Sequence, residues 1–339
     1  MSGPGVSGGR LPEKVVALGG GTGLPSMLRG FKELMGHEAT DGLTAIVTMT
    51  DDGGSSGRLR RGLGVPPPGD LRNCMVALAS EEDLFSALFQ HRFDEAGELG
   101  GHTLGNLVMA ALTEQTGSFR RAIETSSQVL RIRGRILPAT LDDVRLEAQL
   151  EDGSRLHGES TIGASDRAIR RIRLVPRRVR PAQGVLEAIA EADLIVIGPG
   201  SLYTSVVPNL LVDGIAEALR RSPATRIFIG NLVHERGEGR ALKGAEHLGV
   251  LERHAGDALV DAIVVHDGTF DAVRLERYLG EGSRPLDWNG VPDDIPIHRA
   301  PLLADGPKLR HDPTATVNAI LEAWRMHRAE RASRWGNEG

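Results

Sequence analysis

The sequence has few of the residues on which several common functions depend. Its 339 residues include one cysteine, Cys74, which excludes an internal disulfide bond and a metal cluster built on cysteines. Aromatic residues make up 4% of the chain, too few to predict a base-stacking surface for nucleic acid. No apolar run approaches the length of a membrane span. The net charge of −5 is mild and does not indicate a nucleic-acid-binding protein.

The two ends of the chain differ in composition from the rest. Met1–Arg10 is rich in Gly and Ser and lacks the apolar stretch of a signal peptide, so we expect a cytoplasmic protein. We predict a disordered N-terminal tail over residues 1–13, a single domain over 14–325 and a C-terminal tail over 326–339. Because rigid α/β domains of this size commonly pair, we expect a homo-oligomer, most simply a dimer.

Short apolar runs alternate with helical segments through most of the chain, which predicts an α/β fold with a mainly parallel sheet. The clearest strands are Lys14–Leu18, Leu43–Val47, Asp193–Ile197, Arg226–Gly230 and Asp261–His266. Between residues 131 and 179 the apolar residues recur with a period of two, and Asp152-Gly153 is a typical hairpin turn. We therefore predict a small antiparallel β-rich insertion there, starting with a strand over Arg131–Leu137.

The loop after the second strand, Asp51–Arg60, has the most unusual composition. It combines two adjacent carboxylates with three glycines, two serines and two arginines. Glycines let backbone N–H groups approach an anion, arginines bind phosphate with two hydrogen bonds, and paired aspartates can hold Mg²⁺. Asp, Gly and Ser are also ordinary turn residues, so a solvated turn is the alternative. We favour a phosphate-handling loop.

Two other loops combine glycine with a following helix. Gly19–Gly23 follows the first strand, but its spacing matches neither the dinucleotide-binding fingerprint nor a P-loop. It is compatible with an anion bound at a helix N-terminus and equally with a tight turn that binds nothing. Gly198–Ser205 follows a later strand and precedes a helix predicted over Asn209–Arg220. Since the carboxyl ends of parallel strands share one edge of a sheet, we expect these loops to converge.

Polar residues also stand at the starts of two predicted helices. In Pro66–Asn73, Asp70 is a plausible N-cap, whereas Arg72 and Asn73 are not explained by capping. His102 and Asn106 are four residues apart and would share one helical face, which favours a ligand contact over a purely structural role.

The segment Arg170–Arg180 is strongly basic and lies in the predicted insertion. It suits contact with an acidic partner or a membrane surface. More often such a run is the solvated face of an edge strand that carries charge against aggregation. We favour the second interpretation.

With these loops quoted, the chain resembles the 2-phospho-L-lactate transferase (CofD-like) family, and most closely its gluconeogenesis-factor (YvcK-type) branch. The resemblance covers most of the chain. The matching blocks are Gly19–Leu24, Val47–Arg60, Pro67–Asn73, Gly101–Leu107, Gly198–Leu211 and Arg310–Pro313.

The resemblance implies a three-layer α/β/α Rossmann-like core. It also implies a cytoplasmic protein that supports cell shape and cell-wall synthesis on gluconeogenic carbon sources, and that binds a UDP-sugar such as UDP-N-acetylglucosamine. The transferase branch instead moves a phospholactyl group from a nucleotide diphosphate donor with Mg²⁺. In this chain Asp51 and Asp52 are followed by Gly53–Arg58. That pattern resembles the gluconeogenesis-factor branch, and it puts the deazaflavin chemistry in doubt.

The candidate ligand site combines these loops, with Tyr278 as a base-stacking or core residue. Its expected members are Gly20, Gly21, Thr22, Gly23, Asp52, Gly54, Ser55, Ser56, Arg60, Asp70, Arg72, Asn73, His102, Asn106, Gly198, Gly200, Ser201, Tyr203, Thr204, Asn231, Tyr278 and Arg310. The metal candidates are Asp51 and Asp52, which are also catalytic candidates together with His102 as general base.

Two functions follow. The first is a regulatory protein that binds a nucleotide sugar without turnover and acts on cell-wall enzymes or their regulators. The alternative is a Mg²⁺-dependent transferase that uses a nucleotide-diphosphate-linked donor.

Overall fold

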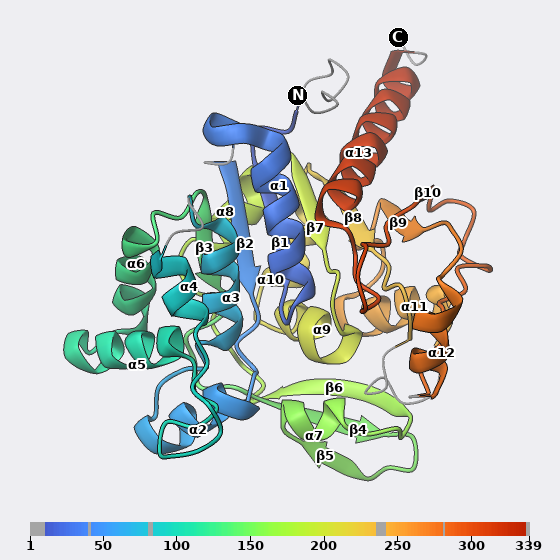
Figure 1. Cartoon of the computed structure of the whole chain (residues 1–339). Coiled ribbons are helices and arrows are strands. Elements are labelled where there is room, and N and C mark those ends of the chain that lie inside the picture. The colour runs from blue at the N-terminus through green and yellow to red at the C-terminus, as the bar shows by residue number, and fades with distance from the viewer. Residues whose placement is uncertain (1–10, 40–41, 81–83, 235–241, 281, 337–339) are drawn as a thin grey trace.

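The computed structural model describes residues 11–39, 42–80, 84–234, 242–280 and 282–336. Its centre is a seven-stranded sheet, ordered β10-β9-β8-β7-β1-β2-β3, in which all paired neighbours are parallel (Figure 1). The strands are β1 (Val15–Gly19), β2 (Leu43–Val47), β3 (Arg135–Pro138), β7 (Leu194–Ile197), β8 (Thr225–Ile229), β9 (Ala262–His266) and β10 (Ile297–Ala300).

Helices cover both faces of this sheet, as the predicted α/β class requires (Figure 1). On one face α1 (Gly23–Ala39) packs against α3 (Gly69–Leu78) and α13 (Pro313–Gly336). On the other lie α8 (Val185–Glu191), α9 (Val207–Leu210) and α10 (Ile215–Arg221). The remaining main helices are α2 (Gly54–Leu63), α4 (Leu84–Gln90), α5 (Leu104–Thr116), α6 (Phe119–Val129), α11 (Gly244–Ala255) and α12 (Ala272–Gly280).

The central strands form the core. Every residue of β1, β2 and β7 is buried, and their side chains are almost all aliphatic. A strand covered by helices on both faces has no solvated side, so it needs apolar residues at successive positions instead of alternate ones. The continuous apolar runs in the sequence therefore predicted these strands correctly.

A three-stranded antiparallel sheet lies below the main sheet in Figure 1. It contains β4 (Arg145–Leu150), β5 (Arg155–His157) and β6 (Ile169–Val175), with the short helix α7 (Glu159–Gly163) between β5 and β6. The predicted hairpin at Asp152-Gly153 joins β4 to β5.

The predicted start of the insertion was wrong. The segment over Arg131–Leu137 does not belong to the small sheet, because β3 pairs in parallel with β2 and forms the edge of the main sheet. Its buried Ile136 lies opposite Ala45. A short strand that is open on one side has the same alternating pattern in either kind of sheet, so periodicity alone could not assign it.

Three other boundaries differ from the prediction. The Asp51–Arg60 segment is mostly helix, since α2 begins at Gly54. The helix expected over Asn209–Arg220 is instead two helices, α9 and α10, separated by residues 211–214. At the C-terminus α13 continues to Gly336, so residues 326–336 of the predicted C-terminal tail are helical.

The strand order places a topological switch point between β1 and β7. From β1 the chain adds β2 and β3 on one side, and β7 and the later strands on the other. Leu18 of β1 pairs with Ile197 of β7, so both strands end at the same level. The helices that follow them, α1 and α9, lie on opposite faces of the sheet (Figure 1). Open α/β sheets commonly bind ligands in the crevice at such a point.

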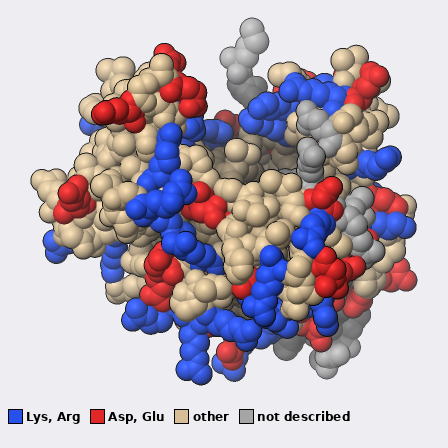
Figure 2. All heavy atoms as spheres, turned by 90° about the horizontal axis from the view of Figure 1, so that it is seen from below, with Lys and Arg blue, Asp and Glu red and all other residues tan. Residues whose placement is uncertain are grey.

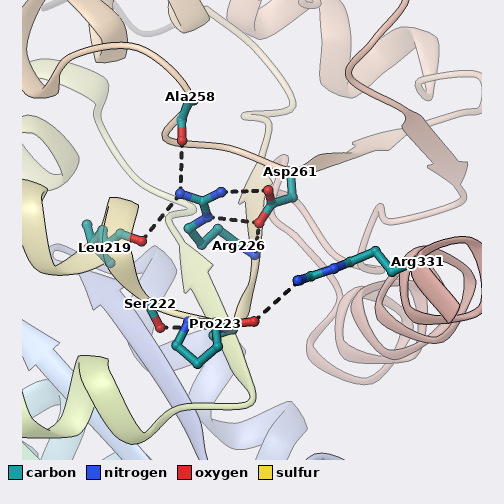
Figure 3. Close-up of polar contacts among 8 residues, drawn as sticks. Leu219, Ser222, Pro223, Arg226, Ala258, Asp261 and Arg331 are labelled. Atoms are coloured by element: carbon teal, nitrogen blue, oxygen red, sulfur yellow. Dashed lines mark hydrogen bonds and ion pairs between the residues drawn. The ribbon is translucent and has the colours of Figure 1, made fainter. Parts of the chain in front are cut away.

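The opposite, amino-terminal edge is held by an ion pair (Figure 3). Arg226 at the start of β8 binds both carboxylate oxygens of Asp261, at 2.6 and 2.8 Å. Its remaining Nη1 donates to the carbonyl oxygens of Leu219 and Ala258. Arg331 of α13 donates nearby to the Pro223 carbonyl oxygen. These bonds join α10, β8 and the segment before β9, far from the carboxyl edge.

Within the described part of the chain, none of the helices combines the length and the apolar character needed to cross a bilayer.

Candidate functional site

The turn between β1 and α1 is built from glycines because backbone from another loop packs against it. Gly21 has a φ of +61°, a conformation that favours glycine. A Cβ atom on Gly23 would lie 2.4 Å from the Pro199 carbonyl oxygen, a distance that no side chain tolerates. The β1–α1 turn and the loop after β7 therefore meet backbone to backbone at the N-terminus of α1, where helix amides favour an anion.

The loop after β7 is fixed by a side chain from the next strand. Asn231 follows β8, and its side-chain amide forms two bonds with Gly200. The Gly200 N–H donates to Asn231 Oδ1 at 3.3 Å, and Asn231 Nδ2 donates to the Gly200 carbonyl oxygen at 3.0 Å. Gly200 has a φ of +155°. The loops after β1, β7 and β8 thus form one connected structure.

Asp70 holds the glycine turn from the side of α3. It is not the N-cap that the sequence suggested; Pro68 occupies that position and Asp70 lies within the first turn. Its Oδ2 accepts the Gly21 N–H at 2.8 Å. Burial raises the pKa of Asp70 to about 6, opposed by this hydrogen bond and reinforced by the nearby Asp51 carboxylate.

A chain of hydrogen bonds connects His102 to Asn73. Ser55 Oγ bonds to His102 Nδ1 at 3.0 Å and accepts from Asn106 Nδ2 at 3.0 Å. Arg72 then donates through Nε to Asn106 Oδ1 and through Nη2 to Asn73 Oδ1. Burial is the main cause that lowers the pKa of Arg72, to about 10. Five predicted residues from α2, α3, α5 and the segment before α5 therefore form one network, in which Arg72 orients Asn73.

Asp52 performs a role that its sequence position does not reveal. Its carboxylate accepts hydrogen bonds from the Glu159 N–H at 3.0 Å, the Ser160 N–H at 2.9 Å and the Ser160 hydroxyl at 2.7 Å. It therefore satisfies the first amides of α7, in the manner of an N-cap supplied from a distant part of the chain. Asp51 accepts the Gly53 N–H, which stabilises the turn into α2.

This cap places Glu159 beside three aspartates. Burial raises the pKa of Glu159 to about 7, and the carboxylates of Asp51, Asp52 and Asp70 raise it further, against a hydrogen bond from Thr204. Near neutral pH, Glu159 is therefore protonated in a substantial fraction of molecules.

The C-terminal wall comes from the segment before α13. Tyr278 supports it from α12, because its hydroxyl oxygen accepts the Leu309 N–H at 3.1 Å. His311 Nε2 donates to the Gly230 carbonyl oxygen at 3.1 Å. Burial lowers the pKa of His311 to about 4, so its imidazole is neutral at physiological pH.

These elements enclose a cleft of about 790 Å³ at the carboxyl edge of the sheet. Its wall includes ten of the predicted site residues: Gly20, Gly21, Thr22, Gly23, Asn73, Gly200, Ser201, Thr204, Asn231 and Arg310. The volume is in the range of sites for small molecules and cofactors. Glycine turns from distant parts of the sequence therefore share one hollow.

The other predicted residues lie outside the cleft wall. The supporting contacts described above include Asp51, Asp52, Ser55, Asp70, Arg72, His102 and Asn106. Ser56 Oγ accepts the Gly69 N–H at 3.1 Å, Gly54 begins α2, and Gly198 follows β7 with a φ of +82°. Arg60 forms an ion pair with Asp143. Tyr203 is buried in the core, where its hydroxyl donates to the Ile169 carbonyl oxygen. Tyr278 is half-buried beneath Leu309.

Several residues on the cleft wall were missed from the sequence. Ser26 and Arg29 belong to α1 and are three residues apart, so a helical projection from the glycine turn could have found them. Gln90 ends α4. Glu159 and Ser160 come from α7, a five-residue helix that lacks a periodic signal.

The predicted metal ligands Asp51 and Asp52 both accept hydrogen bonds in this conformation. Both oxygens of Asp52 are already bonded to α7, and Oδ1 of Asp51 is bonded to Gly53. Among the described residues, no group of three or more His, Cys, Asp or Glu side chains is arranged to hold a metal ion. A carboxylate that accepts hydrogen bonds can also bind Mg²⁺, and Mg²⁺ often takes only one or two protein carboxylates, so the metal role of Asp51 and Asp52 stays a prediction.

Comparisons with known proteins agree with this architecture. The family model for the 2-phospho-L-lactate transferase CofD matches residues 15–302. A gluconeogenesis factor of Halalkalibacterium halodurans is 43% identical over 321 residues, which cover 91% of this chain and 96% of that protein. The gluconeogenesis factor of Bacillus subtilis is 45% identical, with 81% and 86% covered. A putative gluconeogenesis factor of Thermotoga maritima is 43% identical, with 95% and 100% covered.

Solved structures show the same fold. Two crystal structures of a Bacillus halodurans protein superpose with TM-scores of 0.85 and 0.84 at 42% sequence identity, covering 91% of this chain and 99% of theirs. Both the family match and the identity extend over most of the chain, as the resemblance in its loops predicted. The chain therefore belongs to the 2-phospho-L-lactate transferase CofD family, and within it to the group of gluconeogenesis factors.

Proposed function

We propose that this protein is a gluconeogenesis factor that binds a nucleotide diphosphate sugar, such as UDP-N-acetylglucosamine, in the cleft without turning it over. The observation that carries the proposal is the meeting of the Gly20–Gly23 turn with the Pro199–Ser201 loop on one cleft at the switch point of the sheet. The names of the relatives from H. halodurans and B. subtilis support the general role.

One part of the cleft suits a diphosphate. The first amides of α1 carry partial positive charge, and Arg29 and Arg310 also line the wall. Guanidinium groups bind phosphate oxygens with paired, charge-assisted hydrogen bonds. The glycines leave the backbone bare, so phosphate oxygens can reach the amides directly.

Another part suits sugar hydroxyls. Glu159, Ser160, Asn73 and Thr204 line the wall and offer hydrogen-bond acceptors and donors. Glu159 on the wall, with Asp51, Asp52 and Asp70 behind it, would repel a diphosphate if all four carboxyl groups were ionised. The raised pKa of Glu159, about 7, leaves this group partly neutral near neutral pH and so reduces that repulsion. Leu232, Val233 and Leu309 add an apolar surface against which a base can pack.

In this proposal ligand occupancy is a signal. The protein acts in the cytoplasm during growth on gluconeogenic carbon sources, where it reports the supply of nucleotide sugar to enzymes or regulators of cell-wall synthesis and cell shape. A protein with this role needs a ligand cleft and an output surface but no reactive group. His102 lies outside the cleft wall, so it is not placed as a general base for a ligand bound there.

The alternative is a Mg²⁺-dependent phospholactyl-type transferase, favoured by the description of the matching family model. That reaction needs Asp51 or Asp52 free to hold the metal. In the observed conformation both oxygens of Asp52 accept hydrogen bonds from α7, whereas only Oδ1 of Asp51 is shown accepting one, so Asp51 is the simpler metal ligand for this alternative.

Isothermal titration with UDP-N-acetylglucosamine, followed by prolonged incubation with Mg²⁺ and chromatography of the nucleotide, separates the two functions. We expect saturable binding and unchanged ligand. A donor that is consumed with release of a nucleotide product would refute the non-catalytic proposal. Failure of UDP-N-acetylglucosamine, UDP-glucose and UDP to bind would refute the ligand class. The variant Arg226→Lys, at the far edge of the sheet, is a matched control for changes at Arg310.

A further inference from the structure

The outer face of the β4-β5-β6 sheet is strongly and selectively basic. Strand register puts alternate residues of the three strands on this face: Arg145, Glu147, Gln149, Arg155, His157, Arg171, Arg173 and Val175. Four are arginines and one is an acid. Their neighbours Leu146, Ala148, Ile172 and Leu174 point the other way and are buried. We call the eight outward residues the arginine face.

The charges on this face are not neutralised within it. Glu147 is buried at the centre of the face, opposite Arg173 and within 3.4 Å of Arg155. Arg173 also donates to Gln149. Arg145 and Arg171 are exposed, and Arg170, Arg177 and Arg178 continue the exposed basic surface along the chain. Figure 2 views the molecule from this side and shows basic side chains across the lower part of the surface. One internal acid therefore leaves a net positive face on a chain whose overall charge is −5.

We propose that the arginine face is the docking surface for an acidic patch on a partner protein. This deepens the function proposed above, because a ligand-binding regulator needs an output surface. Guanidinium groups arranged in rows on a rigid sheet match carboxylates bidentately, whereas surface charge that only maintains solubility needs no such concentration of one sign. Complementary charge of this kind sets partner choice and association rate.

The distribution of charge over this molecule favours a protein as the partner of the arginine face over a nucleic acid or a membrane. A nucleic acid or a membrane continues past the patch over a molecule whose overall charge is −5, so it gains less from the arginine face than a discrete acidic patch does. The arginine face has no Phe, Tyr or Trp for base stacking or membrane insertion; its only exposed aliphatic side chain is Val175. A discrete acidic patch can match the arginines and still avoid Glu147.

Helix α7 connects the small sheet that carries the arginine face to the cleft. Helix α7 packs against β4 and supplies Glu159 and Ser160 to the cleft wall. Asp52 fixes the start of this helix. A ligand that moves α7 therefore acts directly on the sheet that carries the arginine face.

The test measures fluorescence anisotropy of a short fluorescein-labelled poly-glutamate peptide titrated with the full chain at low salt. We expect saturable binding that Arg145→Glu/Arg171→Glu weakens by about tenfold or more. The neutral variant Arg145→Gln/Arg171→Gln should bind the peptide with intermediate affinity. Because these changes are conservative, weaker binding by this variant cannot be attributed to unfolding. The control Arg120→Glu/Arg121→Glu on α6 has the same net charge as the first variant and should bind like wild type.

The proposal is overturned if wild type does not bind the peptide, if the face variants bind it as well as wild type, or if the α6 control loses as much affinity. Tighter binding to phosphatidylglycerol vesicles or to a single-stranded oligonucleotide would also overturn it. All arms are run without nucleotide. The face variants are then titrated with UDP-N-acetylglucosamine, and unchanged affinity there separates failure of this surface from failure of the ligand site.

Discussion

Glu159→Gln tests whether burial and neighbouring carboxylates make the ionised form of Glu159 unfavourable in the folded protein. The change removes the charge, keeps the side-chain volume and retains an oxygen that can accept from Thr204. In the folded protein the pKa of Glu159 is raised from 4.5 to about 7, first by burial and then by Asp51, Asp52 and Asp70. The unfolded chain has the ordinary value, so the unfolded state gains free energy from ionisation before the folded state does.

The sign and size of the effect follow from that difference. Below pH 4.5 both states are protonated, and Glu159 costs no stability. Between pH 4.5 and 7 the penalty grows, and above pH 7 it is constant. At 1.36 kcal/mol per pKa unit the full penalty is about 3 kcal/mol. We expect about 2 kcal/mol because the cleft admits solvent that screens the neighbouring charges.

Urea unfolding at pH 8 and pH 4 measures the effect. The glutamine variant should be about 2 kcal/mol more stable than wild type at pH 8 and equal to it at pH 4. Glu187→Gln, at an exposed position of α8, is the control and should change neither value. If Glu159→Gln is no more stable than wild type at pH 8, the carboxylates do not interact as described. A stabilisation that is the same at both pH values would also refute the reasoning, because it would have no link to ionisation.

Three further changes separate binding from folding. Gly23→Ala forces a Cβ against the Pro199 carbonyl oxygen; we expect about 2–4 kcal/mol of lost stability by urea unfolding, and a variant as stable as wild type would contradict the backbone contact. Arg226→Ala leaves Asp261 without its partner and should cost about 3 kcal/mol, with unchanged titration by UDP-N-acetylglucosamine; weaker binding would show that the two edges of the sheet are coupled. Arg310→Ala should weaken that binding by at least about tenfold in calorimetry and leave the melting temperature within a few degrees of wild type; unfolding of the variant would show that Arg310 is structural.

Much of the fold was readable because buried parallel strands have a plain signature. The runs at Leu43–Val47 and Leu194–Ile197 correspond to observed strands, and the glycine turns after β1 and β7 lie where strand ends required them to be. The convergence of Gly21 and Ser201 on one cleft followed from a general property of parallel sheets. These features depend on local composition, which a single sequence contains.

The remaining features depend on contacts between distant residues. Nothing near Asp52 in the sequence indicates that it caps α7, more than a hundred residues later. The same separation hid Glu159, whose raised pKa exists only after the insertion folds against α3 and the start of α2. Tyr203 was misleading for a related reason. A tyrosine beside a glycine loop suggests a ligand contact, but here its ring fills the core under β6.

The cap that Asp52 provides has a consequence for protein engineering. A chimera that grafts the three-stranded subdomain of one family member onto the core of another looks feasible, since the graft is one contiguous stretch of sequence. The two parts are nonetheless joined by a carboxylate that stays behind in the host. In such a hybrid α7 will pack correctly only when the host has a carboxylate at position 52 that accepts hydrogen bonds from the first amides of the helix. Position 52 and the transplanted segment therefore have to be exchanged together.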